Sequence, residues 1–247
     1  MMIKLSKTLL AHIKLKYIEL FKEFSDVFAW SYEDLKSYDI EIIQHKIPLK
    51  ENQKPFKQKM RRINPIRLPL VQKEIMKMYD ASIIVPVRYS KWVSNLVSIR
   101  KKTREIRLCI DFRDLNKASL KDNYPLPKMD HILQRVVGSK RISLLDVYSG
   151  YNQILVYPAD QLKIAFTTPW GTFMYVKMPF GLINAGATFQ RAMDISFSEE
   201  LGYFIIIYLD GVTVFSKTDE EHLEHLRNAF EKCRKFGISL KIGRAHV

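Results

Sequence analysis

The sequence has few cysteines and no long apolar run, and each shortage excludes a class of protein. Its two cysteines, Cys109 and Cys233, are too few for the disulfide framework of a small secreted protein and lack C-x-x-C metal spacing. We therefore expect two core thiols in a reducing compartment. The longest apolar run, 203–209, holds seven residues, far fewer than the roughly 20 that cross a bilayer. The N-terminal segment has lysines but no uninterrupted apolar stretch, so neither secretion nor a membrane partner is expected.

Acidic residues are also scarce relative to basic ones. The chain has 26 Asp and Glu against 40 Lys and Arg, a net charge of +14. Residues 46–121 hold 20 Lys and Arg but only 6 Asp and Glu, so this stretch carries the whole excess. A solvated basic surface would explain the count, but its concentration in one segment favours a polyanion bound through its phosphates. Aromatic residues interleave with the charges: Phe56, Tyr89, Trp92 and Phe112.

The hydropathy pattern predicts a mixed α/β chain of one or two domains. With 247 residues, 47% of them hydrophobic, the chain can bury a sizeable core. Helical spacing predicts helices over 10–24, 71–79, 129–137 and 184–193. Short β-rich runs predict strands over 83–85, 96–99, 108–110 and 142–146. The basic, proline-containing stretch 45–69 lacks periodicity and indicates an extended connector.

The C-terminal part has the clearest local signals. Residues 203–216 read as two apolar strands, and Asp210-Gly211 between them favours a type I′ hairpin turn. Thr218 and Glu221 have the spacing of a capping box at the start of a helix. One face of that helix is apolar: Leu223, Leu226, Phe230, Cys233 and Phe236.

Two apolar strands each deliver an aspartate at an end or tip, Asp146 and Asp210. Carboxylate oxygens are the ligands that Mg²⁺ prefers, and two metal ions can stabilise the attacking and leaving oxygens of a phosphoryl displacement. Spacing alone does not establish such a site, because an aspartate that closes a strand or begins a turn is also common for its backbone hydrogen bonds.

Five segments occur in an order and at spacings that resemble gypsy-class reverse transcriptases of long-terminal-repeat retrotransposons, closest to plant members. They are LCIDFRDLNK, YPLPKMD, SLLDVYSGYNQI, MPFGLINAGATFQ and YLDG. The resemblance runs from about Asp26 to Leu240, nearly the whole chain. It implies an RNA-directed DNA polymerase with an α/β (α+β) right-hand fold made of fingers and palm.

The resemblance also implies a division of the chain. It places an N-terminal helix and lead-in at 1–45, fingers at 46–140 and 163–186, and palm at 141–162 and 187–240. On this division we expect no thumb or ribonuclease H region within the sequence. A non-native tail is expected at 241–247, because its last six residues, IGRAHV, can be encoded by a common sequencing adapter. A frayed basic terminus is the alternative.

The resemblance assigns roles to single residues. Asp146 and Asp210 would bind two Mg²⁺ ions, with Mn²⁺ as a possible substitute. The triphosphate would be held by Arg100, Lys101 and Arg107. Tyr151 would lie under the sugar and exclude a 2′-hydroxyl, and Phe180 with Gly181 would pack against nucleotide and template. Gln190 is expected only to cap or pack. The implied partners are an RNA or DNA template with its primer, and deoxynucleoside triphosphates.

One position departs from the family pattern. The motif Tyr-x-Asp-Asp here ends in Gly211, so we expect the hairpin to form while one carboxylate of the metal site is lost. The main hypothesis is a polymerase domain with impaired catalysis. The alternatives are a catalytically dead remnant that still binds template-primer, a degenerate fragment with no selected role, or an unrelated nucleic-acid-binding protein. The cytoplasm, in a virus-like particle, and the nucleus are the expected locations.

Overall fold

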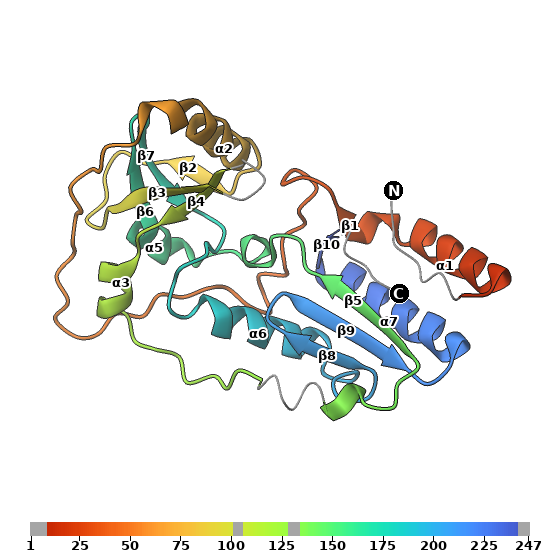
Figure 1. Ribbon diagram of the computed structural model, residues 1–247. Coiled ribbons are helices and arrows are strands. Elements are labelled where there is room, and N and C mark those ends of the chain that lie inside the picture. The colour runs from red at the N-terminus through yellow and green to blue at the C-terminus, as the bar shows by residue number, and fades with distance from the viewer. Residues whose placement is uncertain (1–8, 101–105, 128–133, 242–247) are drawn as a thin grey trace. The chain divides into compact units, whose positions relative to one another are not determined.

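The computed structural model describes residues 9–100, 106–127 and 134–241, apart from the side chain of Arg100 (Figure 1). The chain divides into two compact units. Unit 1 consists of 1–43, 124–153 and 186–247, and unit 2 consists of 44–123 and 154–185. Each unit is therefore built from segments that are far apart in the sequence.

Unit 1 is centred on a three-stranded antiparallel sheet with the order β5-β9-β8. Its strands are β5 (Arg141–Asp146), β8 (Ile205–Tyr208) and β9 (Gly211–Ser216). The longer helices of the unit, among the residues described, are α1 (Ala11–Glu23), α6 (Ala185–Ser196) and α7 (Asp219–Phe236). A short parallel pair, β1 (Phe28–Ala29) with β10 (Leu240–Lys241), joins its two ends.

Helices α1 and α7 lie side by side in unit 1 and share an aromatic core (Figure 1). The ring of Phe230 in α7 lies 5.4 to 5.6 Å from the rings of Phe21, Phe24 and Phe28. The capping box predicted from Thr218 and Glu221 begins α7, with both of its hydrogen bonds formed. The predicted first and last helices are thus confirmed.

Unit 2 contains a five-stranded sheet with the order β2-β7-β6-β3-β4. Its strands are β2 (Ile84–Pro86), β3 (Ser94–Arg100), β4 (Ile106–Ile110), β6 (Ala165–Thr168) and β7 (Gly171–Tyr175). Its helices are α2 (Leu68–Asp80), α3 (Arg113–Ala118) and α5 (Pro158–Gln161). Single-turn 3₁₀ helices occur at Ser25–Val27, Pro65–Arg67, Gly150–Gln153 and Leu162–Ile164 of the two units.

The structure corrects several expectations for unit 2. Helix α2 begins at Leu68, three residues before the predicted start, because Pro69 fits the first helical turn. Trp92 and Phe112 are buried core residues, so of the four aromatics expected to interleave with the basic charges only Phe56 and Tyr89 are exposed. Of the two cysteines only Cys233 is buried, whereas Cys109 in β4 is partly exposed. Part of the helix expected at 129–137 lies outside the described residues, and 134–136 is helical.

No helix in the described part of the chain is long and apolar enough to span a membrane. The connector at 45–69 has the extended character expected from its sequence. It pairs with the body of unit 2 through single bridges, from His45 to Val156, from Leu49 to Ser119 and from Lys57 to Val93.

A buried histidine joins α7 to the sheet of unit 1. The Nε2 and Nδ1 atoms of His222 lie 2.7 and 2.8 Å from the hydroxyls of Ser143 and Ser216. Burial, with smaller contributions from His225 and Arg141, lowers the pKa of His222 to about 4. Between pH 6.5 and 4 the unfolded chain therefore binds a proton at this residue that the folded chain does not bind.

The unfolding free energy is therefore expected to decrease as the pH falls from 6.5 towards 4. Between pH 7 and pH 5 the titration of His222 is expected to lower the free energy of unfolding by about 2 kcal/mol. Urea unfolding of the chain and of His222→Asn at both pH values checks this. The variant should lose less stability on acidification, while His45, whose pKa is also about 4, titrates in both proteins. Equal losses in the two proteins would contradict the assignment.

Candidate functional site

The hairpin of β8 and β9 carries the first candidate carboxylate, and its turn differs from the prediction. Tyr208 pairs with Gly211, so Leu209 and Asp210 are the two central residues of the turn. Leu209 has a φ of 52° and Asp210 does not have a positive φ, whereas a type I′ turn needs a positive φ at both central residues. The predicted type I′ turn at Asp210-Gly211 is wrong, because Gly211 is the first residue of β9 and has no positive φ.

The pairing of β5 with β9 brings the second carboxylate beside the first. Asp146, the last residue of β5, lies opposite Gly211, and the backbone N–H of Val147 donates to the carbonyl oxygen of Asp210 at 2.8 Å. Asp146 is half-buried and Asp210 is exposed. Along β5, Asp146 shares a strand face with Ile142 and Leu144, both of which are exposed. The two aspartates thus lie at the same end of the sheet of unit 1.

Tyr151 is brought to the same place. Burial, followed by the charge of Asp210, raises the pKa of the Tyr151 hydroxyl. Its ring packs edge-on against Phe189 of α6, with 5.3 Å between the centroids. A Cβ atom added to Gly186 of α6 would meet both the Tyr151 hydroxyl and the side chain of Leu209 at 3.7 Å. Asp146, Asp210, Gly211 and Tyr151 therefore form one group in unit 1.

The carboxylates of Asp146 and Asp210 suit a hard divalent cation, but this group contains only these two. Oxygen ligands at the ends of adjacent strands match the preference of Mg²⁺. Within the described residues, however, no cluster of three or more His, Cys, Asp and Glu side chains could hold a metal ion. Gly211, which lies directly opposite Asp146, supplies no carboxylate to this group.

The sequence did not reveal the part played by Gln190. Its side chain does more than cap or pack, because its Oε1 accepts a hydrogen bond from the backbone N–H of Leu209 at 3.0 Å. Helix α6 thereby contacts the turn that carries Asp210. No local pattern could have shown this bond, since its partners are 19 residues apart.

The second group of candidate residues lies in unit 2. The guanidinium of Arg107, an exposed residue of β4, stacks over the ring of Phe180 at 5.0 Å. Gly181 follows with a φ of 97°, a conformation that favours glycine. Arg100 ends β3, but its side chain and the whole of Lys101 lie outside the described residues. Arg107, Phe180 and Gly181 are therefore close together in this unit.

Asn116 is a residue of unit 2 that the sequence interpretation gave no role. It belongs to the LCIDFRDLNK segment, and its Nδ2 donates to the carbonyl oxygen of Gly181 at 2.7 Å. Its Oδ1 accepts from the backbone N–H of Ile183 at 2.9 Å. The side chain thus binds the backbone at Gly181 and at Ile183, in the loop that begins with Phe180.

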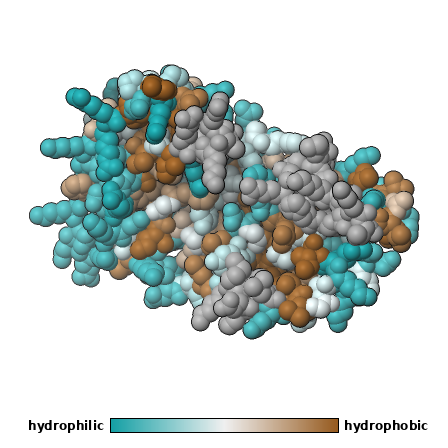
Figure 2. Space-filling model, viewed as in Figure 1, coloured by the Kyte–Doolittle hydropathy of each residue, from teal (hydrophilic) through white to brown (hydrophobic). Residues whose placement is uncertain are grey.

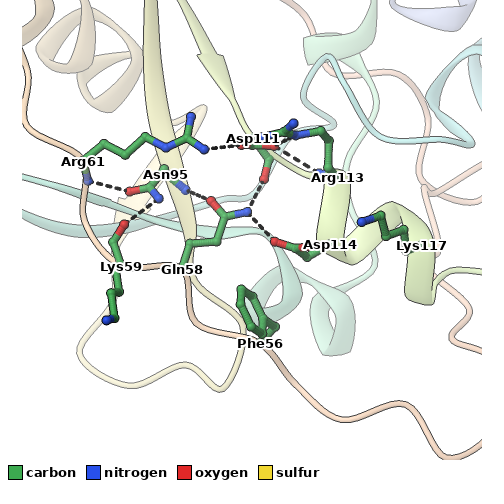
Figure 3. A pocket seen from close by; sticks show the side chains of 9 residues that line it. All are labelled: Phe56, Gln58, Lys59, Arg61, Asn95, Asp111, Arg113, Asp114 and Lys117. Carbon is green, nitrogen blue, oxygen red and sulfur yellow. Dashed lines mark hydrogen bonds and ion pairs between the residues drawn. The ribbon is translucent and has the colours of Figure 1, made fainter.

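A polar pocket of about 370 Å³ lies in the basic part of unit 2 (Figure 3). The carboxylate of Asp111 lies between Arg113 at 2.7 Å and Arg61 at 3.3 Å, and the Arg113 hydrogen bonds lower the pKa of Asp111. Gln58 bridges from the connector to Asp114 and to the backbone of Asn95. These contacts fasten the connector to β3 and α3.

Lysines complete the rim of this pocket. Lys59 and Lys117 line it, and neither forms an ion pair with the residues that the structure describes. Figure 2 shows hydrophilic side chains gathered along the edge of unit 2 that the connector follows. This edge is suited to an anionic partner bound through its phosphates.

Solved structures define the class of fold. The prototype foamy virus protease–reverse transcriptase, in its selenomethionine-labelled CSH mutant, matches with a TM-score of 0.88 over 97% of this chain and 32% of that one, at 20% identity. The foamy viral enzyme solved in complex with RNA/DNA hybrid gives a TM-score of 0.88 over the same shares, at 19% identity. The mixed α/β fold is therefore that of the matching reverse transcriptase region.

Sequence comparison gives the family. The family model described as reverse transcriptase (RNA-dependent DNA polymerase) matches residues 99–243. An RNA-directed DNA polymerase homolog of Oenothera berteroana is 38% identical over 49% of this chain and 88% of its own length. The chain belongs to the reverse transcriptase family, whose members are nucleotidyltransferases.

The relatives also include retroelement polyproteins. The retrovirus-related Pol polyprotein from transposon 412 of Drosophila melanogaster is 30% identical over 95% of this chain, and the match covers 20% of that polyprotein. The one from transposon gypsy of the same species is 35% identical over 66% of this chain and 16% of the polyprotein. The chain is thus similar to the reverse transcriptase domain of such polyproteins and spans only a fraction of their length.

Replacing Asn116 by alanine should release the loop of Phe180 and Gly181. The loss of two hydrogen bonds is expected to reduce the stability of unit 2 by about 1–3 kcal/mol, and the backbone amide of Ile183 should exchange its hydrogen faster. Urea unfolding and amide exchange measured by NMR check both effects. Asn123→Ala, at an exposed asparagine of the same unit, is the matched control and should change neither quantity. Unaltered exchange at Ile183 in Asn116→Ala would contradict the role of the bond.

Proposed function

We propose that this chain is the fingers and palm of a reverse transcriptase from a gypsy-class long-terminal-repeat retrotransposon, closest to plant members. Residues 46–140 and 163–186 would be the fingers, and 141–162 and 187–240 the palm. Unit 2 takes in 44–123 and 154–185, which covers most of the proposed fingers. The boundaries differ in two places, because 124–140 belongs to unit 1 and 154–162 belongs to unit 2. The observation that carries the proposal is the pairing of Asp146 with the residue that follows Asp210.

The reaction is the extension of a primer by attack of its 3′-hydroxyl on the α-phosphate of a deoxynucleoside triphosphate. Asp146 and Asp210 would hold two Mg²⁺ ions, which when bound stabilise charge on the attacking and leaving oxygens. Tyr151, held against Phe189 beside Asp210, would present its ring to the sugar and exclude a 2′-hydroxyl.

Unit 2 would bind the triphosphate and the template. The guanidinium of Arg107 lies over the Phe180 ring, and its planar fork of N–H donors is suited to phosphate oxygens. Gly181 presents backbone without a side chain, which permits close approach of a nucleotide. The basic edge with Lys59 and Lys117 supports binding of an RNA or DNA template with its primer. Foamy viral relatives solved with RNA/DNA hybrid and with double-stranded DNA support the same partners.

The glycine at position 211 is expected to impair this chemistry without harming the fold. Its backbone has no positive φ, and an added Cβ would meet only the Tyr208 carbonyl oxygen, at 3.4 Å. An aspartate therefore fits at this position. Since a carboxylate is missing from a site that must place two divalent ions, we propose that catalysis by this chain is weak.

A second candidate function follows from the same observation. With Asp146 and Asp210 alone at the site, the chain would act as a catalytically dead remnant that binds template-primer through the basic edge of unit 2. Binding then persists without turnover, and it weakens as salt displaces the phosphate contacts.

Primer extension on poly(rA)/oligo(dT) with Mg²⁺ separates these functions. We expect Gly211→Asp to extend the primer at least about 10-fold faster than the original chain. Even a residue that only supports a metal ligand is worth about 10- to 100-fold in metal affinity or activity, and a carboxylate in the site itself should be worth no less. Equal rates would show that the two aspartates suffice. Template-primer binding by both proteins with extension by neither would favour the binding remnant.

Arg107→Ala, made in the Gly211→Asp background, should raise the KM for dTTP about 10- to 100-fold, since a hydrogen bond to a charged group is worth about 1.5–3 kcal/mol. Arg107→Lys should recover only part of this loss, because lysine keeps the charge but not the flat stacking on Phe180. Steady-state kinetics measure the effect. Arg88→Ala, at an exposed arginine of the same unit, is the control, and an equal rise in KM there would refute a specific role for Arg107.

A further inference from the structure

Gln190 lies at the centre of a buried hydrogen-bond chain that reaches the turn of Asp210. The residue is 0% exposed, and its Oε1 accepts the N–H of Leu209 at 3.0 Å. Leu209 has a φ of 52°, and for a leucine this left-handed conformation costs roughly 1–2 kcal/mol. The turn therefore adopts a disfavoured backbone at the residue that receives the bond.

The orientation of the Gln190 amide is fixed from its other end. Its Nε2 donates to Oδ1 of Asp194 at 2.9 Å and, over a longer 3.4 Å, to the carbonyl oxygen of Ile207. The other carboxylate oxygen of Asp194 accepts from the hydroxyl of Tyr124 at 2.5 Å. Because an ionised carboxylate only accepts and a backbone N–H only donates, a single amide orientation satisfies both neighbours.

The hydrogen-bond chain continues from the turn to the other strand. Leu209 is followed by Asp210, whose carbonyl oxygen accepts the N–H of Val147 at 2.8 Å. Val147 is the residue after Asp146. Gln190 belongs to α6. Through its bond to Leu209 it nevertheless fixes the backbone of the turn that keeps Asp210 beside Asp146.

We propose that Gln190 is a positioning residue for nucleotidyl transfer, which holds Leu209 in its left-handed conformation and so fixes Asp210 beside Asp146. The inference rests on the proposed function. A residue needed only to fill space would be replaced without loss by methionine, which has a similar volume. The proposal instead requires one group that accepts at Oε1 and donates at Nε2.

The first test follows the Leu209 amide by hydrogen exchange in the full chain, using NMR. In Gln190→Met this amide should exchange at least about 10-fold faster, since about 1.4 kcal/mol of hydrogen bonding corresponds to tenfold. Unchanged exchange overturns the proposal. This measurement needs no turnover, so it tests the bond to the turn even if no variant extends a primer.

A matched control is available in unit 1. Gln153 is also buried, at 2% exposure, and binds Tyr148 and Ser239 through three hydrogen bonds of 2.7 to 2.9 Å. Gln153→Met should lower stability to a similar degree but leave the exchange of Leu209 unchanged. If both variants accelerate it equally, Gln190 acts only through general stability and the proposal fails.

The second test measures positioning by Mn²⁺ affinity, followed by electron paramagnetic resonance, and by primer extension in the Gly211→Asp background. Gln190→Met should weaken Mn²⁺ binding and lower kcat by about 10- to 100-fold without a comparable rise in the KM for dTTP. Gln153→Met should change both quantities by clearly less, because its hydrogen bonds do not reach the turn of Leu209 and Asp210. If Gly211→Asp itself is inactive, the proposed function loses its support, while the Mn²⁺ measurement still decides the role of Gln190.

A rescue experiment tests whether Gln190 acts through the backbone conformation of Leu209 or through another contact. Glycine adopts a positive φ without the cost that leucine bears, so adding Leu209→Gly should restore most of the Mn²⁺ affinity lost in Gln190→Met. Such coupling is measured by a double-mutant cycle. Additive losses in the double variant would mean that Gln190 does not act through the conformation of Leu209, and would overturn the proposal.

Discussion

The antiparallel pairing of β5 with β9 is the constraint on which the rest of unit 1 depends. Leu145 and Val212 are paired and buried, and one step further along the same register Asp146 meets Gly211 at the end of the sheet. A slip of one residue would turn every side chain of a strand to the opposite face. It would bury Asp146 and break the contact of Ser143 with His222 in α7. The burial of apolar side chains in unit 1 therefore fixes the position of Asp146 at the end of the sheet.

Much of the fold could be predicted from local patterns, and the exceptions have physical reasons. The capping box of α7, the apolar face of α1 and the strand ending in Asp146 are local signals that the structure bears out. The pair Asp210-Gly211 was misleading, because long-range pairing of Tyr208 with Gly211 moved the turn one residue back. Strands β6 and β7 were not predicted at all, since runs such as AFTT and GTFMY are short and give no clear alternation.

The candidate site was much less accessible to reasoning from residues alone. Asp146 and Asp210 could be suspected as aspartates at strand ends, but only the resemblance to a family connected them. Arg107 stacks on Phe180, 73 positions further along the chain, and Asn116 binds Gly181 across 65 positions. Contacts between segments so far apart leave no local pattern in hydropathy or spacing, and they arise only when the sheet of unit 2 has formed.

The free space around Gly211 has a consequence for how cellular quality control would treat this chain. Neither its backbone conformation nor its surroundings depend on the absence of a side chain there. Cellular quality control recognises unfolded populations, and an exchange of glycine and aspartate at this position would change that population little. Chaperones and proteases would then treat both versions alike. The proposed loss of a carboxylate at this position would therefore be detected by no process that recognises unfolded protein, and only selection on catalysis would act on it.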